Sequence, residues 1–267
     1  GVTVGTSVGA LFLAGLVPGI LVGLLLMVAV YVMAKRKGWP QAERRAPASE
    51  LWAAFKDAIL ALLLPVFLLG AIVTGLTTAT EAGVIGVVYA LFLAGIVYRE
   101  FSFRQLGTIV VEAAVNTAIP LFVVATTSVV AWVVAIEQFP DSLVGFFNGL
   151  DASPWVVLIL INLFLVVIGM FVDLVPALIL FAPILLPVAV AQGVDPVQFG
   201  AIMVVNLGVG LVTPPVGNCL YVGAAVAKVP VGRLVRASLP FLLINFLTLL
   251  LVTFVPWISL FLPSLFY

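Results

Sequence analysis

Long apolar stretches separated by short polar segments run through this chain. A bilayer core about 30 Å thick is crossed by about 20 apolar residues in a helix, and two stretches, Leu11–Ala34 and Leu239–Leu262, have this length. The apolar stretches between them are Ile59–Thr74, Val84–Tyr98, Leu106–Ile136, Pro154–Ile168, Ala177–Ala191, Val197–Leu211 and Val216–Ala227. Leu51–Asp57 has interfacial character, and Gln138–Ser153 is expected to be turn-rich. The pattern predicts an all-α integral membrane protein built as a multi-span helical bundle.

The positive charges predict which loops of the chain face the cytoplasm. All eleven Lys and Arg residues fall in three clusters, at 35–56, 99–104 and 228–236, and cytoplasmic loops carry an excess of such residues. With all three clusters inside, the segments between them cross the membrane an even number of times. The outside stretch 137–195 then carries acidic residues and no Lys or Arg. The C-terminus is predicted outside.

Two apolar arms, Pro154–Ile168 and Ala177–Ala191, are short for full spans. Both of their outer ends face the same side in this map. A re-entrant helical hairpin with its tip near Asp173 fits these lengths. Two tilted full spans are the alternative.

Composition narrows the function classes. Apolar residues make up 64% of the chain and charged residues 8%, whereas a soluble domain has about 45–50% and about 25%. The net charge of zero offers no basic surface for nucleic acid. The chain has no His and a single Cys, Cys219, so the common ligands of a zinc or haem enzyme are missing.

Three breaks interrupt the apolar stretches at positions expected within the membrane: Gly75–Gly83, Gly169–Pro176 and Gly208–Gly217. Irregular backbone at that depth is tolerated where it is buried in protein or lines a polar cavity. Unwound segments leave carbonyl oxygens free, Pro214 and Pro215 donate no N–H, and hard cations prefer oxygen ligands. Half-helix N-termini direct a positive dipole at an anion. The breaks therefore predict the binding site of a secondary transporter.

Structural roles stay open for several residues in these breaks. Gly75 and Gly83 are each explained by helix packing. Asp173 is either a functional charge at membrane depth or a protonated or shallow structural residue. Glu81 is either a helix N-cap or an ion ligand. Asn206 either bonds to a neighbouring helix or belongs to the site.

Several motifs at these breaks carry a family resemblance. They are Gly-Leu-Thr-Thr-Ala-Thr-Glu-Ala at 75–82, Gly-Met-Phe-Val-Asp at 169–173 with Pro-Ile-Leu-Leu-Pro at 183–187, Gly-Val-Asp-Pro at 193–196, Asn206-Leu207, and Gly-Leu-Val-Thr-Pro-Pro-Val-Gly at 210–217. Together they resemble the large membrane subunit of the tripartite ATP-independent periplasmic (TRAP) transporters. The first is similar to that family's Thr-Pro-Thr-Glu-Ala signature, with Ala79 where Pro is usual. The likeness covers most of the chain.

The resemblance implies a fold of inverted repeats, each with a hairpin and a broken helix, in an elevator-type transporter. The chain is then the C-terminal portion of a longer subunit and holds the second repeat in one transmembrane permease domain. Residues 1–58 are expected to form a scaffold span and a cytoplasmic loop. Residues 59–238 are mainly the transport region, with hairpin 154–191 and broken helix 197–227. Residues 239–267 are a second scaffold span.

The resemblance also implies sodium-coupled import of an organic acid, of the dicarboxylate or sialic-acid type, with no organic cofactor. A periplasmic binding protein delivers the substrate, a small membrane subunit enlarges the scaffold, and the complex lies in the bacterial inner membrane. The expected sodium ligands are Thr77, Thr78, Gly208, Thr213 and Gly217. The expected substrate-binding residues are Asp173, Asn206, Thr213 and Pro214. Asp173 would polarise or brace the hairpin tip, and Asn206 would brace the broken helix or meet substrate.

Other functions were weighed against this one. A stand-alone sodium- or proton-coupled anion carrier would transport without a binding protein. An intramembrane enzyme would need a nucleophile–base pair or metal ligands at depth, and every Lys lies at a predicted interface. A purely structural membrane subunit has no need of breaks that contain Thr and Asp. The sequence therefore favours a transporter subunit that is not an enzyme.

Overall fold

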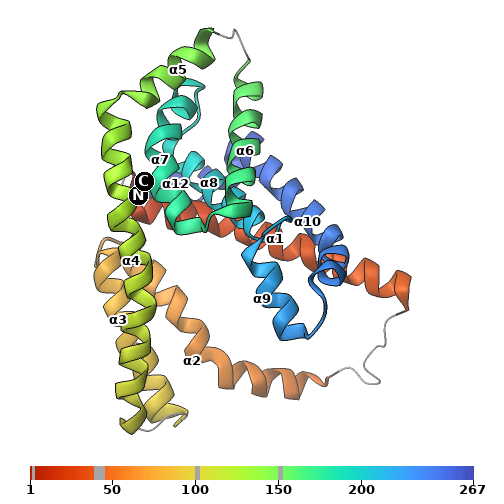
Figure 1. Ribbon diagram of the computed structural model, residues 1–267. Helices are drawn as coiled ribbons and strands as arrows, with labels where there is room; N and C mark the ends of the chain where they lie inside the picture. The colour runs from red at the N-terminus through yellow and green to blue at the C-terminus, as the bar shows by residue number, and fades with distance from the viewer. Residues whose placement is uncertain (2–3, 39–45, 100–102, 150–152) are drawn as a thin grey trace. The chain divides into compact units, whose positions relative to one another are not determined.

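The computed structural model describes residues 1, 4–38, 46–99, 103–149 and 153–267. Over these ranges every regular element is a helix (Figure 1). The α-helices are α1 (Val8–Lys37), α2 (Ala48–Val73), α3 (Ala79–Phe92), α4 (Leu106–Ile136), α5 (Phe139–Gly149), α6 (Pro154–Phe171), α7 (Leu174–Ala191), α8 (Pro196–Leu211), α9 (Asn218–Ala227), α10 (Val231–Phe254), α11 (Pro256–Leu260) and α12 (Pro263–Phe266). A π-helical segment, η2 (Leu93–Val97), extends α3, and a 3₁₀ helix, η3 (Phe103–Gln105), precedes α4.

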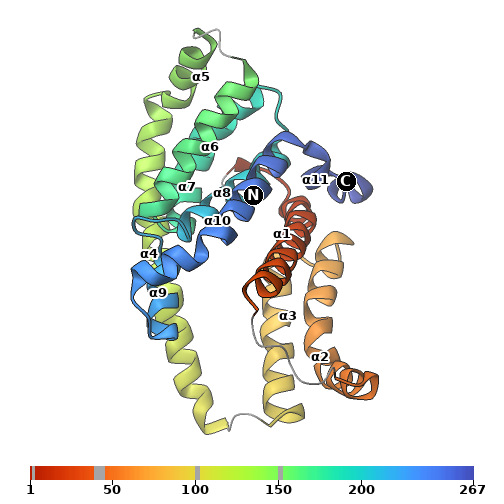
Figure 2. The same cartoon turned by 90° about the vertical axis from the view of Figure 1, so that its right-hand side faces the viewer.

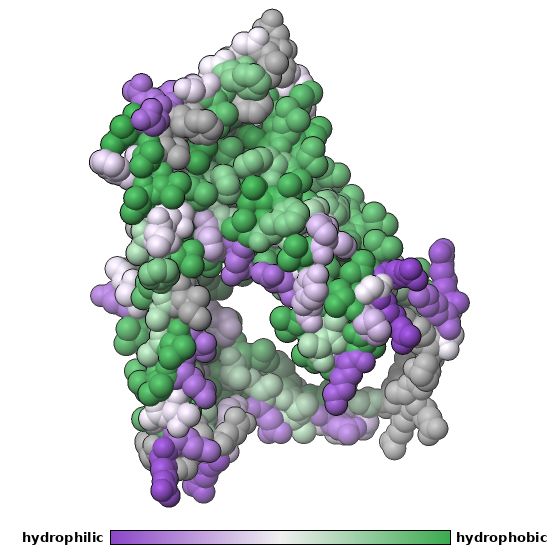
Figure 3. Space-filling model, in the orientation of Figure 1, coloured by the Kyte–Doolittle hydropathy of each residue, from purple (hydrophilic) through white to green (hydrophobic). Residues whose placement is uncertain are grey.

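Seven of the described helices are long and apolar enough to cross a bilayer: α1, α2, α3 with η2, α4, α6, α7 and α10. Large apolar side chains on them, such as Met27, Phe67 and Leu243, are exposed. Figure 3 shows hydrophobic residues over much of the visible surface. An exposed apolar surface of this extent belongs against lipid or protein rather than water. The all-α multi-span fold predicted from the sequence is confirmed.

The helices form two compact units, residues 1–32 with 119–267, and residues 33–118. We call the first the hairpin unit and the second the α2–α3 unit. In the hairpin unit α8 contacts α6, α7 and α10, and Figures 1 and 2 show these helices grouped together. Three side chains of α8, Phe199, Ile202 and Leu207, are at most 2% exposed. Lipid tails are as apolar as these residues, so close packing rather than escape from water stabilises the contact.

Two glycines bring α6 and α8 into backbone contact. A Cβ on Gly210 would lie 2.6 Å from the Cα of Gly169, and a Cβ on Gly169 would lie 3.1 Å from the Cα of Gly210. No side chain larger than hydrogen fits between the two helices at this level. Small residues at a membrane helix interface allow this close approach. The end of α8 is thereby pressed against the end of α6.

In the α2–α3 unit, two tyrosines join the helices. The hydroxyl of Tyr89 in α3 donates to the carbonyl of Leu60 in α2 at 2.8 Å, and the hydroxyl of Tyr98 donates to the carbonyl of Asp57 at 2.8 Å. The second bond lies where the π-helical segment ends. None of the residues of α2 is buried, so its apolar sides are open in the described chain.

Several predicted boundaries are wrong, for identifiable reasons. Leu51–Asp57 is part of α2, which runs through it without a break and on to Val73; its interfacial character stays a prediction. Gln138–Ser153 was expected to be turn-rich, yet α5 occupies most of it. Leu143 and Val144 of α5 pack against the hydrophobic core, and this tertiary contact outweighs the Pro and Gly residues of the segment.

The breaks are also shorter than predicted. The hairpin turn holds only Val172 and Asp173 between α6 and α7, and the next break begins at Val212 rather than at Gly208. The last long helix begins at Val231 and ends before Pro256, whose ring cannot continue a helix. Part of the first basic cluster, residues 39–45, lies outside the described residues.

The two units divide the chain differently from the expected segments. The hairpin unit contains most of α1 and all of α10, which the resemblance placed in a scaffold. The hairpin, residues 154–191, and the broken helix, residues 197–227, lie in that same unit.

The glycine contact predicts a selective loss of stability. Gly210→Ala should lower the free energy of unfolding by roughly 1–3 kcal/mol, because its methyl group collides with the backbone of Gly169. Gly208→Ala, in the same helix, meets nothing within 4 Å and should be neutral or stabilising by up to about 1 kcal/mol. Thermal unfolding of the purified permease in detergent measures both. Equal unfolding temperatures for the two variants would contradict the contact.

Candidate functional site

The hairpin turn is formed by two extended residues. Val172 has φ −112° and ψ 139°, and Asp173 has φ −67° and ψ 157°. Asp173 is exposed, and its Oδ1 accepts the N–H of Leu174 at 2.9 Å. A carboxylate in this position satisfies a free donor of the helix N-terminus and interacts favourably with the helix dipole. Asp173 thus caps α7 at the tip of the hairpin, and its role in transport stays a prediction.

The second break separates α8 from α9 over Val212–Gly217. The N–H of Thr213 donates to the carbonyl of Gly210 at 2.9 Å, and its hydroxyl donates to the carbonyl of Val209 at 2.6 Å. Thr213 is buried, at 7% exposed. Pro214 and Pro215 follow and offer no N–H, which prevents the helix from continuing. Gly217 then starts α9 from a left-handed conformation, with φ +49°, which favours glycine.

One hydrogen bond joins the hairpin to this break. The N–H of Gly217 donates to the carbonyl of Met170, near the end of α6, at 3.2 Å. The backbone contact between Gly169 and Gly210 lies beside it. Two of the three breaks predicted from the sequence therefore meet in space, within one compact unit.

Main-chain groups converge at this junction. A Cβ on Gly217 would lie 2.8 Å from the carbonyl oxygen of Thr213 and 3.2 Å from that of Leu211. Among the described residues, neither oxygen accepts a bond from a backbone N–H. The N–H groups of Asn218 and Cys219 lie in the first turn of α9. Among the described residues they have no backbone acceptor. Carbonyl oxygens suit a hard cation, and a helix N-terminus suits an anion.

The remaining predicted residues lie elsewhere. Gly208 is in the last turn of α8, inside regular helix. Thr77 and Thr78 belong to the α2–α3 unit, in the segment between α2 and α3. The hydroxyl of Thr77 is buried without a hydrogen-bond partner among the described residues.

Thr78 and Glu81 form a capping box. Thr78 is the N-cap of α3: its hydroxyl accepts the N–H of Glu81 at 3.3 Å, and Glu81 Oε2 accepts the N–H of Thr78 at 2.7 Å. Glu81 therefore takes part in capping from the third helical position, not as the N-cap itself.

Asn206 is fully buried and bonded to a neighbouring helix. Its Nδ2 donates to the carbonyl oxygen and to the side-chain Oδ1 of Asn162 in α6, at 2.9 and 2.8 Å. Its contact with substrate stays a prediction. The sequence analysis overlooked Asn162, Gln198 and Thr253, which are buried nearby. Amide side chains in strongly apolar helices are the signal for them, since each needs a partner at depth.

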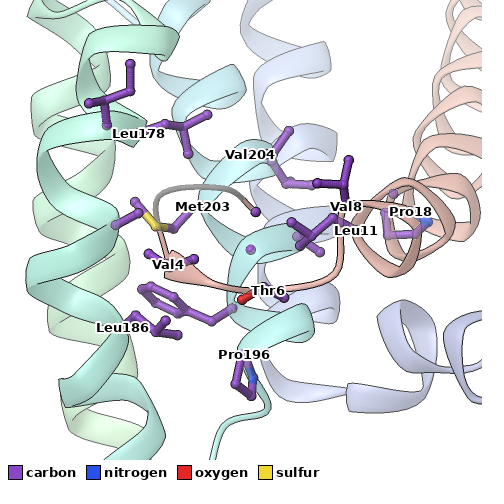
Figure 4. Close-up of a pocket in the computed structure, with 18 of the residues that line it drawn as sticks. Val4, Thr6, Val8, Leu11, Pro18, Leu178, Leu186, Pro196, Met203 and Val204 are labelled. Carbon is purple, nitrogen blue, oxygen red and sulfur yellow. The ribbon is translucent and has the colours of Figure 1, made fainter. Parts of the chain in front are cut away.

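An apolar cavity lies apart from these polar groups. It has a volume of about 650 Å³ and is lined by the N-terminal segment, α1, α7 and α8 (Figure 4). Leu178, Met203 and Val204 are among its lining side chains. It includes neither the hairpin turn nor the break at Val212–Gly217. Its chemistry does not suit an organic anion.

Comparisons with known proteins identify the family of the chain. Residues 1–258 match the family described as the tripartite ATP-independent periplasmic transporter, DctM component. The chain is 40% identical over 259 residues to the C4-dicarboxylate TRAP transporter large permease protein DctM of Pseudomonas aeruginosa, covering 97% of this chain and 60% of that protein. It is 41% identical over 269 residues to the sialic acid TRAP transporter large permease protein SiaM of Vibrio cholerae, covering 100% and 62%.

A third relative is the 2,3-diketo-L-gulonate TRAP transporter large permease protein YiaN of Escherichia coli, 36% identical over 256 residues, covering 96% of this chain and 60% of that protein. The chain thus spans about three-fifths of the length of these relatives. All three are named as transporter permeases and none as an enzyme. With its seven apolar helices, the chain is a multi-pass membrane protein that belongs to the DctM component family of tripartite ATP-independent periplasmic transporters.

Proposed function

We propose that this chain is part of a sodium-coupled permease that imports an organic acid. The observation that carries the proposal is the junction of the hairpin turn with the break at Val212–Gly217, joined by the Gly217 N–H and the Met170 carbonyl. Interrupted helices that meet at membrane depth place free carbonyls and a helix N-terminus together. A cation and an anion can therefore occupy neighbouring positions.

The anion is best placed at the start of α9. The N–H groups of Asn218 and Cys219 are free to bind a carboxylate, with the dipole of α9 behind them. The relatives named above carry C4-dicarboxylates, sialic acid and 2,3-diketo-L-gulonate, all of which are carboxylic acids. A substrate of this class is proposed here too, contacted by Asp173, Thr213 and Pro214.

The sodium ion is best placed on the carbonyl side of the junction. The carbonyls of Leu211 and Thr213 approach the same point near Gly217, and oxygen ligands suit a hard cation. Within the α2–α3 unit, Thr77, whose hydroxyl is buried without a partner among the described residues, and Thr78 stay proposed as sodium ligands. Sodium bound beside the anion would lower the free energy of carrying a negative charge through the membrane.

We further propose that α10 moves with the hairpin, where the resemblance placed it in a scaffold. Its Thr253 accepts a hydrogen bond from Asn162 of α6 at 3.2 Å, and its backbone accepts two from Gln198 of α8. A movement of the hairpin past α10 would break these buried bonds, each costly to leave unmade in an apolar medium. A moving part made of α6 to α10 keeps them.

The family description implies a three-part assembly. We propose a periplasmic binding protein that delivers the substrate, and a small membrane subunit beside the permease in the bacterial inner membrane. The three basic clusters then face the cytoplasm and the C-terminus the periplasm. Uptake by vesicles without any binding protein would favour the stand-alone carrier.

Loss of the Asp173 charge should weaken sodium-driven uptake. Asp173→Asn keeps an Oδ1 acceptor but removes its negative charge, which weakens the hydrogen bond from Leu174 by about 1–1.5 kcal/mol, so uptake should fall about tenfold. Thr213→Ala should act in the same direction by removing a hydroxyl oxygen at the junction. Radiolabelled uptake of a panel of organic acids by vesicles that contain the complete transporter measures both. Thr248→Ala, whose hydroxyl bonds only within α10, is the control; normal uptake by both test variants removes the assignment.

Gly217 should tolerate no side chain. Gly217→Ala adds left-handed strain of about 1–2 kcal/mol and a methyl group 2.8 Å from the Thr213 carbonyl, so uptake per copy should drop more than about tenfold. Gly193→Ala has the same type of strain, at φ +84°, but meets nothing within 4 Å. Its uptake should stay within about twofold, since it lies outside the junction. Similar losses in the two variants would mean that backbone strain alone explains them.

The orientation can be measured with single cysteines. On a Cys219→Ser background, Lys37→Cys and Glu137→Cys place exposed thiols on loops predicted to face opposite sides. A membrane-impermeant maleimide should label position 137 in intact cells and position 37 only after the membrane is opened. Labelling of both from the periplasm would refute the topology.

A further inference from the structure

Four buried polar side chains link three helices of the hairpin unit in a ring of hydrogen bonds, which helix α8 completes between Asn206 and Gln198. Asn206, Asn162, Gln198 and Thr253 are 0%, 6%, 3% and 2% exposed, respectively. They come from three helices, α8, α6 and α10. In an apolar surrounding no water replaces a missing partner, so a polar group that is not paired by protein carries a cost.

The hydrogen bonds run around all three helices. Asn206 of α8 donates to Asn162 of α6 at 2.8 and 2.9 Å. Asn162 Nδ2 donates to Thr253 Oγ1 of α10 at 3.2 Å. Gln198 Nε2 of α8 closes the ring by donating to the carbonyl of Thr253 at 3.0 Å. Each helix is therefore bonded to the other two.

Two residues of this ring share a face of α8 with Gly210, which belongs to the hairpin–break junction. Gln198, Ile202, Asn206 and Gly210 are spaced four apart on one buried face of α8, because residues four apart share a helix face. Asn206 is thus one turn before Gly210, which touches Gly169. If α8 shifted along α6 at Asn162 and Asn206, Gly210 would shift against Gly169 by the same amount.

A polar residue at position 206 lowers the stability of the folded protein, which argues against a role in packing alone. Asn206 Oδ1 is buried and has no hydrogen-bond partner in the described part of the chain, and such a group costs about 1–3 kcal/mol. Leucine would fill a similar volume without this penalty. Buried asparagines at helix interfaces are known to fix register at the expense of stability.

We propose that the ring of Asn162, Asn206, Gln198 and Thr253 sets the register of α8 against α6 and α10, and so positions the sodium and anion groups at the junction. In this role they are positioning residues, which act through the backbone of the break rather than through contact with either ligand. The proposal rests on the sodium-coupled function proposed above, and deepens it by naming what holds that site in shape.

The test replaces both partners of the amide pair. Asn162→Leu/Asn206→Leu removes the pair without leaving one partner alone, a change that is nearly neutral for stability. In the complete transporter its unfolding temperature should stay within a few degrees of wild type, whereas the sodium concentration for half-maximal uptake should rise about threefold or more, equivalent to about 0.6 kcal/mol. If the ring served stability alone, the unfolding temperature would fall by more than a few degrees and the half-maximal sodium concentration would stay unchanged.

A milder pair of variants guards against loss of folding. Thr253→Val removes the acceptor that Asn162 uses, whereas Thr248→Val, also buried in α10, removes a hydroxyl bonded only to Ile244. Thr253→Val should raise the half-maximal sodium concentration about threefold, and Thr248→Val should leave it unchanged. Equal values for these two variants, with wild-type values for the double variant if it folds, overturn the proposal.

A readout without transport separates this proposal from the proposed function. Cys219 is exposed in the first turn of α9, next to the junction. Its rate of labelling by a small maleimide, followed by peptide mass spectrometry, should rise about threefold in Thr253→Val and not in Thr248→Val. If wild-type uptake ignores sodium, the proposed function fails, and these labelling rates decide the register role alone. Equal rates then overturn it.

Discussion

The structure depends on one constraint: main-chain polar groups in an apolar medium must be bonded or must face a ligand. Regular helix satisfies the constraint almost everywhere in the described chain. It cannot do so after Leu211, because Pro214 and Pro215 supply no N–H to the preceding turn. Instead, the N–H of Gly217 donates to the distant carbonyl of Met170. Among the described residues, the carbonyls of Leu211 and Thr213 accept no bond from a backbone N–H. These are the oxygens proposed above to bind the sodium ion.

The absence of side chains at two positions makes this arrangement possible. Gly169 and Gly210 touch through their backbones, so the ends of α6 and α8 approach closely enough for the Gly217 N–H to reach Met170. The left-handed conformation of Gly217 then turns the chain into α9. The small size of Gly169 and Gly210 and the backbone freedom of Gly217 therefore act together at the junction. Elsewhere in α8, large apolar residues such as Phe199 stabilise the packing.

The sequence predicted the helices well because membrane helices are specified by local hydrophobicity. Leu11–Ala34 and Leu106–Ile136 correspond closely to α1 and α4. It overestimated the breaks, since Gly208 sits in regular helix once its neighbours are packed. It missed the partners of Asn206 for a different reason. Asn162 is 44 residues away, and Thr253 is 91 residues from Asn162, so no local periodicity can pair them.

The distribution of polar residues separates two tasks within the hairpin unit. Packing among apolar helices gains little from escape from water, because lipid and leucine are equally apolar, and it depends on close fit. Hydrogen bonds are directional and lose most of their strength when misaligned. Asn162 and Asn206 therefore contribute alignment that Ile202 and Leu207 cannot. The site proposed at the main-chain carbonyls of Leu211 and Thr213 depends on that alignment, since a carbonyl oxygen moves only with its backbone.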